Sequence, residues 1–116
     1  MARPHLDSAD FPTLLSGAGQ DSDGTVTGTH IKEHDDVDIA GRGSGSRAWH
    51  GEVTSRVSGN TWNATVSPVS TSSAAYEKAS RVTPIPVPDA TETVDVTVTN
   101  NDGTSNPVPS NSSDVP

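Results

Sequence analysis

The chain has 116 residues, which predicts one domain, and its formal net charge is −8 at pH 7. It contains no cysteine, so disulfide bonds and thiolate zinc sites are excluded. Direct binding of nucleic acid is not expected, because only 7 Lys and Arg side chains stand against 15 Asp and Glu, and the arginines are scattered. No stretch approaches the roughly 18 apolar residues of a membrane-spanning helix, so we expect no contact with a membrane.

Residues 1–20 are predicted to form an extended N-terminal arm, since two prolines hold this stretch open and two glycines loosen its end. Three apolar side chains form a small cluster in it: Phe11, Leu14 and Leu15. This cluster either docks on the chain's own core or anchors the arm on a neighbouring subunit. No apolar run follows the first four residues, so we expect no signal peptide.

A small β domain is predicted over residues 21–103. Residues 21–24, Asp-Ser-Asp-Gly, are typical of a turn, and residues 25–31 alternate weakly, as a strand does. Gly28 in that strand indicates a bulge or a point where another strand approaches closely. After a second turn, residues 37–39 predict a short strand.

The clearest strand signal lies in residues 48–69, which contain both tryptophans. Residues 53–58 mix β-branched and polar side chains, and the sequence Ser-Gly-Asn-Thr at 58–61 indicates a tight turn, because Gly and Asn tolerate a positive φ. Residues 62–66 read as the return strand, which Pro68 ends. The segment is therefore predicted to be a β-hairpin.

The last part of the chain contains the second strong strand, over residues 91–99, with three valines on one face. Before it, residues 74–80 permit a helix that is too short to stand alone. After it, residues 100–103 predict a turn. Residues 104–116 are predicted to form a polar C-terminal tail, rich in Pro and Ser, with no packing face.

These elements predict an all-β fold, namely a small antiparallel β-barrel or sandwich with extended N- and C-terminal arms. Its core is expected to contain five residues: Trp49, Trp62, Val94, Val96 and Val98. Only 29% of the residues are hydrophobic. Burying apolar surface stabilises a fold by about 25 cal/mol per Å². With so few apolar residues, this gain would barely offset the loss of backbone entropy, which costs about 1–2 kcal/mol per ordered residue. We therefore expect neighbouring molecules to complete the fold through oligomerisation.

Two groups of side chains resemble metal-binding patterns. Asp21 and Asp23 open a sequence like a calcium loop, but Lys32 stands where the bidentate Glu of such a loop belongs, so a plain turn is the competing interpretation. His30 and His34 have the spacing of helical zinc ligands, although the residues before them predict a strand. We expect no metal and no other cofactor, with calcium as the alternative.

Catalysis is not expected, and the protein is predicted not to be an enzyme. His50 follows Trp49 and is interpreted as its packing partner rather than as a catalytic base. No set of Ser, His and Asp can be distinguished from chance in a chain so rich in Ser and Asp. So little apolar material can hardly enclose a catalytic pocket.

The hairpin sequence GEVTSRVSGNTWNATV resembles hairpins of small β-barrel virion proteins of tailed viruses, and the Asp-rich, Lys-poor composition is similar to that of haloarchaeal proteins. The resemblance implies a non-enzymatic structural role in the virion, in which the protein decorates the capsid and its arms bridge copies of itself and other virion proteins. A neck or tail position in the same kind of particle is the alternative. The interaction residues would be Phe11, Leu14, Leu15, Trp49 and Trp62.

A surface β-module that binds carbohydrate or protein is a function of a different class. An exposed Trp49 would stack on sugar rings in such a module. Saturable glycan binding that disappears on Trp49→Ala would favour this function. The expected lack of a signal peptide counts against it.

Overall fold

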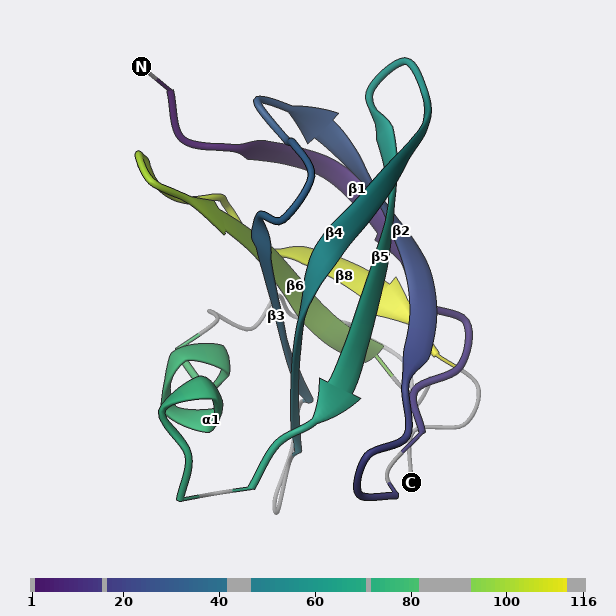
Figure 1. Ribbon diagram of the computed structural model, residues 1–116, viewed down its shortest axis with the longest axis vertical. Coiled ribbons are helices and arrows are strands. Elements are labelled where there is room, and N and C mark those ends of the chain that lie inside the picture. Colours follow the sequence, from purple (N-terminus) through teal and green to yellow (C-terminus); the bar gives the residue numbers. More distant parts are fainter. Residues whose placement is uncertain (1, 16, 42–46, 71, 82–92, 113–116) are drawn as a thin grey trace.

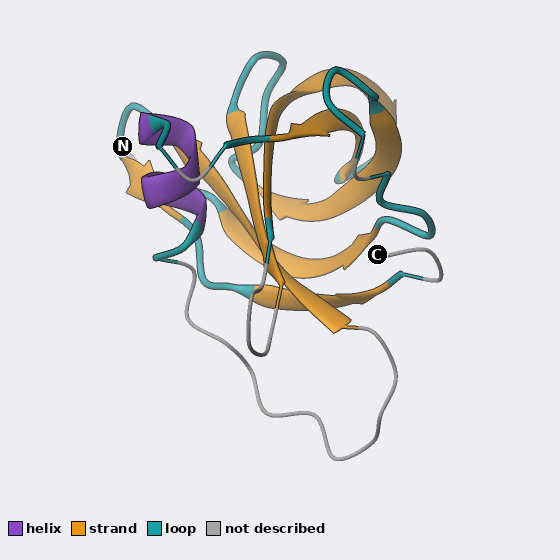
Figure 2. Cartoon of the chain, turned by 90° about the horizontal axis from the view of Figure 1, so that it is seen from below, coloured by secondary structure: helices purple, strands orange, loops and turns teal. Residues whose placement is uncertain are grey.

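A computed structural model of the chain describes residues 2–15, 17–41, 47–70, 72–81 and 93–112. In this part of the chain, eight strands form one antiparallel sheet that curves into a nearly closed barrel (Figure 1). One short helix lies on the outside of the barrel, as the view from below shows (Figure 2). The predicted all-β class and antiparallel barrel are confirmed.

The strands in chain order are β1 (His5–Asp10), β2 (Ser22–Thr29), β3 (Asp36–Gly41), β4 (Ala48–Ser58), β5 (Thr61–Pro68), β6 (Thr93–Asn100), β7 (Gly103–Thr104) and β8 (Val108–Asn111). The helix is α1 (Ala74–Ala79). Hydrogen-bonded neighbours follow the order β1-β2-β5-β4-β3-β6, and both β7 and β8 pair with β6. The barrel closes where β1, at one end of this order, meets β8 at the other.

The predicted hairpin is confirmed as β4 and β5, which are joined by the two-residue turn of Gly59 and Asn60. Gly59 has a φ of 51°, and Asn60 has no positive φ, a pattern typical of a type II′ turn with Gly in the first central position. β4 begins at Ala48, ahead of the predicted strand. Gly51 permits this longer pairing, because a Cβ atom there would lie 1.8 Å from the carbonyl oxygen of Thr65 on β5.

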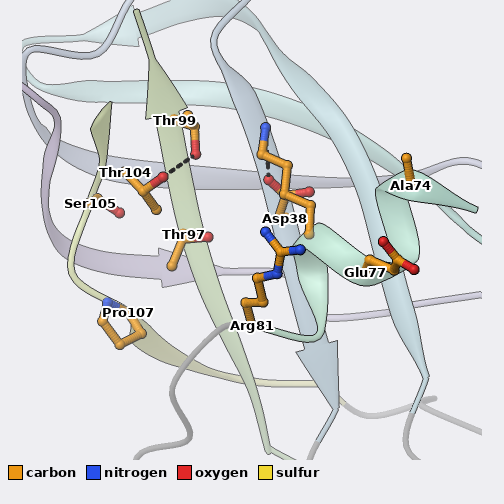
Figure 3. A pocket seen from close by; sticks show the side chains of 10 residues that line it. Asp38, Ala74, Glu77, Arg81, Thr97, Thr99, Thr104, Ser105 and Pro107 are labelled. Carbon is orange, nitrogen blue, oxygen red and sulfur yellow. Dashed lines mark hydrogen bonds and ion pairs between the residues drawn. The ribbon is translucent and has the colours of Figure 1, made fainter. Parts of the chain in front are cut away.

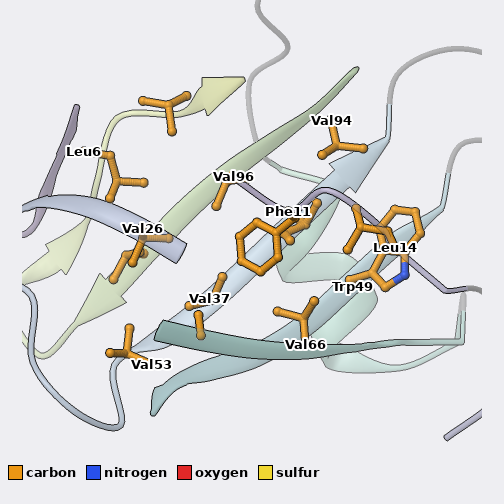
Figure 4. Packing of buried hydrophobic residues seen from close by; sticks show 14 of the residues in the cluster. Leu6, Phe11, Leu14, Val26, Val37, Trp49, Val53, Val66, Val94 and Val96 are labelled. Carbon is orange, nitrogen blue, oxygen red and sulfur yellow. The ribbon is translucent and has the colours of Figure 1, made fainter. Parts of the chain in front are cut away.

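The core fills the inside of the barrel, where every second side chain of each strand points inward. Four of the five predicted core residues are fully buried: Trp49, Val94, Val96 and Val98. The fifth, Trp62, packs against this core from a partly buried position. Phe11 and Leu14 lie with them in the interior (Figure 4). The chain's own residues thus fill the interior of the barrel.

The N-terminal segment belongs to the barrel, which corrects the prediction of a separate arm over residues 1–20. β1 pairs with β2 in antiparallel register, and Leu6, Phe11 and Leu14 are all buried in the core. Gly28 is a point of close approach, as predicted, because a Cβ atom there would lie 2.0 Å from the carbonyl oxygen of His5. The apolar cluster therefore docks on the chain's own core, while Leu15 at its end remains exposed.

The C-terminal segment also belongs to the barrel as far as the structure describes it, which corrects the prediction of a tail without a packing face. β8 pairs with β6 over four residues, from Val96↔Val108 to Thr93↔Asn111. Val108, Ser110 and Ser112 are buried. Residues 113–116 of the predicted tail lie outside the described residues.

The seam between β1 and the C-terminal segment is closed by side chains. Asn106 holds both backbone groups of Leu6: its Oδ1 accepts from the Leu6 N–H at 3.0 Å and its Nδ2 donates to the Leu6 carbonyl at 2.9 Å. Ser110 Oγ accepts from the Phe11 N–H at 2.8 Å, and Ser112 Oγ donates to the Phe11 carbonyl. These polar side chains satisfy backbone groups that the edge of an open sheet would leave unpaired.

Candidate functional site

The candidate site lies on the outer face of the sheet, where β4, β3 and β6 run side by side. Alternation along β3 places Val37 and Ile39 in the core and Asp36 and Asp38 on the outside. The cross-strand register then sets outward side chains into rows. One row contains His50, Asp38 and Thr97, and the next contains Glu52, Asp36 and Thr99.

Helix α1 covers part of this polar face. It begins after Ser73, whose Oγ accepts from the backbone N–H of Tyr76 at 2.9 Å, as an N-cap does. Ala79 on its inner side is fully buried. Lys78 extends from the helix so that its Nζ donates to Asp36 Oδ2 at 2.7 Å and lies 3.6 Å from Asp38 Oδ2. The helix thus brings an ammonium group to two neighbouring carboxylates.

Asp38 is the centre of this cluster, and its side chain is only 1% exposed. Its Oδ1 accepts from His50 Nδ1 at 2.7 Å. Its Oδ2 is buried and has no hydrogen-bond partner, because the Lys78 ammonium lies beyond hydrogen-bonding distance and donates to Asp36 instead. Asp38 therefore keeps unused capacity to accept a hydrogen bond in a place where such capacity is normally satisfied.

A pocket of about 580 Å³ opens between α1, β3, β6 and the segment that follows β7 (Figure 3). Eight of the ten residues that line it have polar or charged side chains, and six of these carry its chemistry: Asp38, Glu77, Lys78, Arg81, Thr97 and Thr99. Its volume falls in the range of roughly 300–1,000 Å³ that is usual for small-molecule sites. The arrangement combines carboxylates, cations and hydroxyl groups on one concave surface.

The charges of the cluster stabilise one another. The hydrogen bond to Asp38 raises the pKa of His50, although partial burial of the ring acts in the opposite direction. Burial lowers the pKa of Lys78, but the hydrogen bond to Asp36 and the negative charge of Asp38 outweigh that effect, so the pKa of Lys78 is raised. Both residues hold their positive charge to higher pH than usual, which suits them to partner the buried carboxylate.

The raised pKa of His50 predicts that stability falls with rising pH. The contribution of the His50–Asp38 pair is fully present below about pH 6.5, the usual pKa of an unfolded histidine, and is lost as the pH rises through the higher pKa of the folded state. Urea unfolding at a series of pH values measures this slope. His50→Gln should remove this pH-dependent loss of stability. His5→Gln changes an exposed histidine and should leave the loss unchanged. An unaltered slope in His50→Gln would contradict the assignment.

The candidate metal ligands considered above belong to no group of three or more His, Asp or Glu side chains that could hold an ion among the described residues. Asp23 lies within β2 rather than in a turn, and its Oδ1 accepts from Thr65 Oγ1 at 2.8 Å. Gly24 serves packing, since a Cβ atom there would lie 2.3 Å from the Phe11 ring. His30 and His34 lie in the exposed connection between β2 and β3, each with a positive φ.

Trp49 and His50 do not form a packing pair, because adjacent residues of a strand point to opposite faces. Trp49 points inward, is fully buried, and its Nε1 donates to the carbonyl oxygen of Leu15 at 2.9 Å. His50 points outward to Asp38. This burial also corrects the idea that Trp49 stacks on sugar rings, because no face of its indole is open to a ligand.

The residues of the outer polar cluster were not predicted as a site. Their signal in the sequence is the alternation of residues 36–40, Asp-Val-Asp-Ile-Ala, and of residues 93–99, Thr-Val-Asp-Val-Thr-Val-Thr. With one set of side chains in the core, the other set had to form a polar outer face. No comparable pattern in the sequence indicates that Lys78 joins this cluster, because Lys78 lies 42 residues from Asp36 along the chain.

No protein-family model, no curated protein and no solved structure matches the chain. Among the described residues, no helix has both the length and the apolar character that crossing a membrane requires.

Proposed function

We propose that the protein is a non-enzymatic structural subunit of a larger particle, a virion, and that it acts by binding neighbouring proteins in that particle. The proposal rests on the β4–β5 hairpin, which projects beyond the rest of the barrel at one end of the molecule (Figure 1). The same segment carries the sequence resemblance to virion proteins of tailed viruses. A binding role is therefore assigned to the tip of this hairpin.

The tip of the hairpin is ordered without packing on the chain's own core. Residues 54–60 are all exposed, and the apolar side chain of Val57 among them is 53% exposed. Arg56 Nε donates to the carbonyl oxygen of Gly59 at 2.9 Å, which stiffens the turn. Beside the turn, β2 pairs with β5 as far as Thr27↔Thr61, and the Gly28 N–H donates to the Asn60 carbonyl oxygen at 3.0 Å, so backbone hydrogen bonds hold one edge of the tip in place. Holding an apolar side chain on a stiff projection favours a contact with another protein.

Repetition of such a contact would let a small surface act strongly. One projecting hairpin buries too little area for a tight complex, but many copies on a symmetric shell or tube multiply a weak contact. The predicted arms cannot serve as bridges in this scheme as far as the structure describes them, because both are part of the barrel. Capsid decoration, neck and tail positions all accommodate a projecting hairpin.

Val57→Asp is expected to weaken binding to the particle about tenfold or more while leaving the fold intact. Burial of a valine side chain contributes about 1.5–3 kcal/mol to such a contact, and the charged replacement would lose it. Because Val57 is exposed, the free energy of unfolding should change by only about 0.5 kcal/mol. Co-sedimentation with particles depleted of the protein measures binding, and urea unfolding measures stability.

The matched control is Asn101→Asp, which adds the same charge at the exposed turn between β6 and β7. It should bind as well as the wild-type protein. If Val57→Asp bound the particle as tightly as the wild-type protein does, the tip of the hairpin would not be part of the interface. The mass of the native material provides the wider test: a megadalton assembly agrees with the proposal, and a free monomer contradicts it.

A further inference from the structure

We propose that the pocket beneath α1 binds a small, neutral, polyhydroxylated ligand such as a monosaccharide or a cyclic polyol. The site is separate from the projecting hairpin, so this binding goes beyond the structural role proposed above. It is argued from the hydrogen-bonding groups that line the pocket and from their charge.

The floor of the pocket offers an acceptor that the protein leaves unused. Asp38 lines the pocket, and its buried Oδ2 has no hydrogen-bond partner. The Lys78 ammonium, 3.6 Å away, forms an ion pair with this oxygen but makes no hydrogen bond to it. The Lys78 side chain is itself 37% exposed and bonded chiefly to Asp36, so it can move aside for a ligand. A ligand hydroxyl donating to Oδ2 would supply the hydrogen bond that this buried oxygen lacks.

The walls add donors and acceptors in close alternation. The Thr97 hydroxyl faces the pocket from β6, in the same cross-strand row as Asp38. The Arg81 guanidinium and the Glu77 carboxylate lie at the side formed by α1 and the residues after it (Figure 3). A hydroxyl group both donates and accepts, so neighbouring hydroxyls on one ring can bond to a carboxylate and to a cation together.

The charges of the site favour a neutral ligand over an ion. Asp36, Asp38 and Glu77 stand against Lys78 and Arg81, and His50 beside Asp38 supplies further positive charge when protonated. The carboxylates are thus nearly balanced by cations within the cluster. A charged ligand would have to give up its hydration without meeting a surplus of opposite charge, whereas a sugar or polyol carries no such cost.

Titration of the full-length, isotope-labelled protein with methyl α-glucoside, methyl α-galactoside and myo-inositol, followed by two-dimensional NMR, tests this assignment. At least one of these probes is expected to cause saturable shifts confined to the backbone amides around Asp38, Lys78, Arg81 and Thr97. Thr97→Val keeps the shape of the side chain and removes one hydroxyl, so it should weaken binding about tenfold. Ala74→Phe, at the exposed rim, should block the pocket and abolish the shifts.

Thr54→Val is the matched control, because it removes a hydroxyl from an exposed strand position outside the pocket. It should bind as the wild-type protein does, and Val57→Asp should do the same. The proposal is overturned if none of the three probes gives saturable shifts, or if Thr97→Val binds as tightly as Thr54→Val. Shifts at this pocket that arise only with glycine or with sodium chloride would also overturn it, since they would show a site for charged groups.

Discussion

Replacing Phe11 with alanine is expected to lower the free energy of unfolding by about 3–5 kcal/mol, the usual cost of removing a buried aromatic ring. Phe11 is fully buried, and its ring fills the space that the missing side chain of Gly24 leaves on β2. Its backbone N–H and carbonyl also join Ser110 and Ser112 across the seam. Urea unfolding of the isolated protein measures the loss.

Leu15→Ala is the matched control for this prediction, because Leu15 belongs to the same apolar cluster but is 37% exposed. Leu15→Ala should lower the free energy of unfolding far less than Phe11→Ala does. An arm that anchors on a neighbouring subunit would behave differently: both substitutions would then leave the isolated chain as stable as before and impair only assembly. If Phe11→Ala and the wild-type protein unfolded at the same urea concentration, the N-terminal segment would be a separate arm, and the position of β1 in the barrel would be contradicted.

The elements that could be predicted from the sequence are those whose signal is local. The hairpin of β4 and β5 has alternating side chains around a Gly-Asn turn, and β6 repeats valine at every second residue. Both patterns fix which side chains enter the core before any partner is known. The same alternation implied the outer row of Asp38 and Thr97, although it did not indicate that this row would line a pocket.

The two ends of the chain could not be predicted in the same way, because their structure depends on each other. Asn106 bonds to Leu6 across 100 residues of sequence, and Ser110 bonds to Phe11 across 99. Isolated, each end has few apolar side chains and several prolines or polar residues, which is typical of an unstructured tail. Each becomes a strand only because the other satisfies its backbone and covers the core.

The charged cluster is non-local for the same reason. Lys78 reaches Asp36 from a six-residue helix that sequence propensity alone would not hold together. The helix is stabilised by its Ser73 cap and by burial of Ala79 against the barrel. Only the folded sheet supplies that surface, so the position of the lysine follows from the tertiary structure.

Deletion of residues 104–116 is expected to abolish cooperative folding. It removes β8 and its four-residue pairing with β6, the buried side chain of Val108, and the side chains that bond to Leu6 and Phe11. The core valines of β6 would then face water along an open edge. Small domains have only about 5–15 kcal/mol of stability to lose, and these combined losses reach that range. Circular dichroism and urea unfolding would report the change.

A single substitution separates this effect from a general sensitivity to truncation. Ser110→Ala keeps the whole chain but leaves the buried N–H of Phe11 without its acceptor, so it should cost about 1–3 kcal/mol. If the longer deletion unfolded at the same urea concentration as the full chain, the C-terminal segment would be a tail after all, and the barrel would close without it.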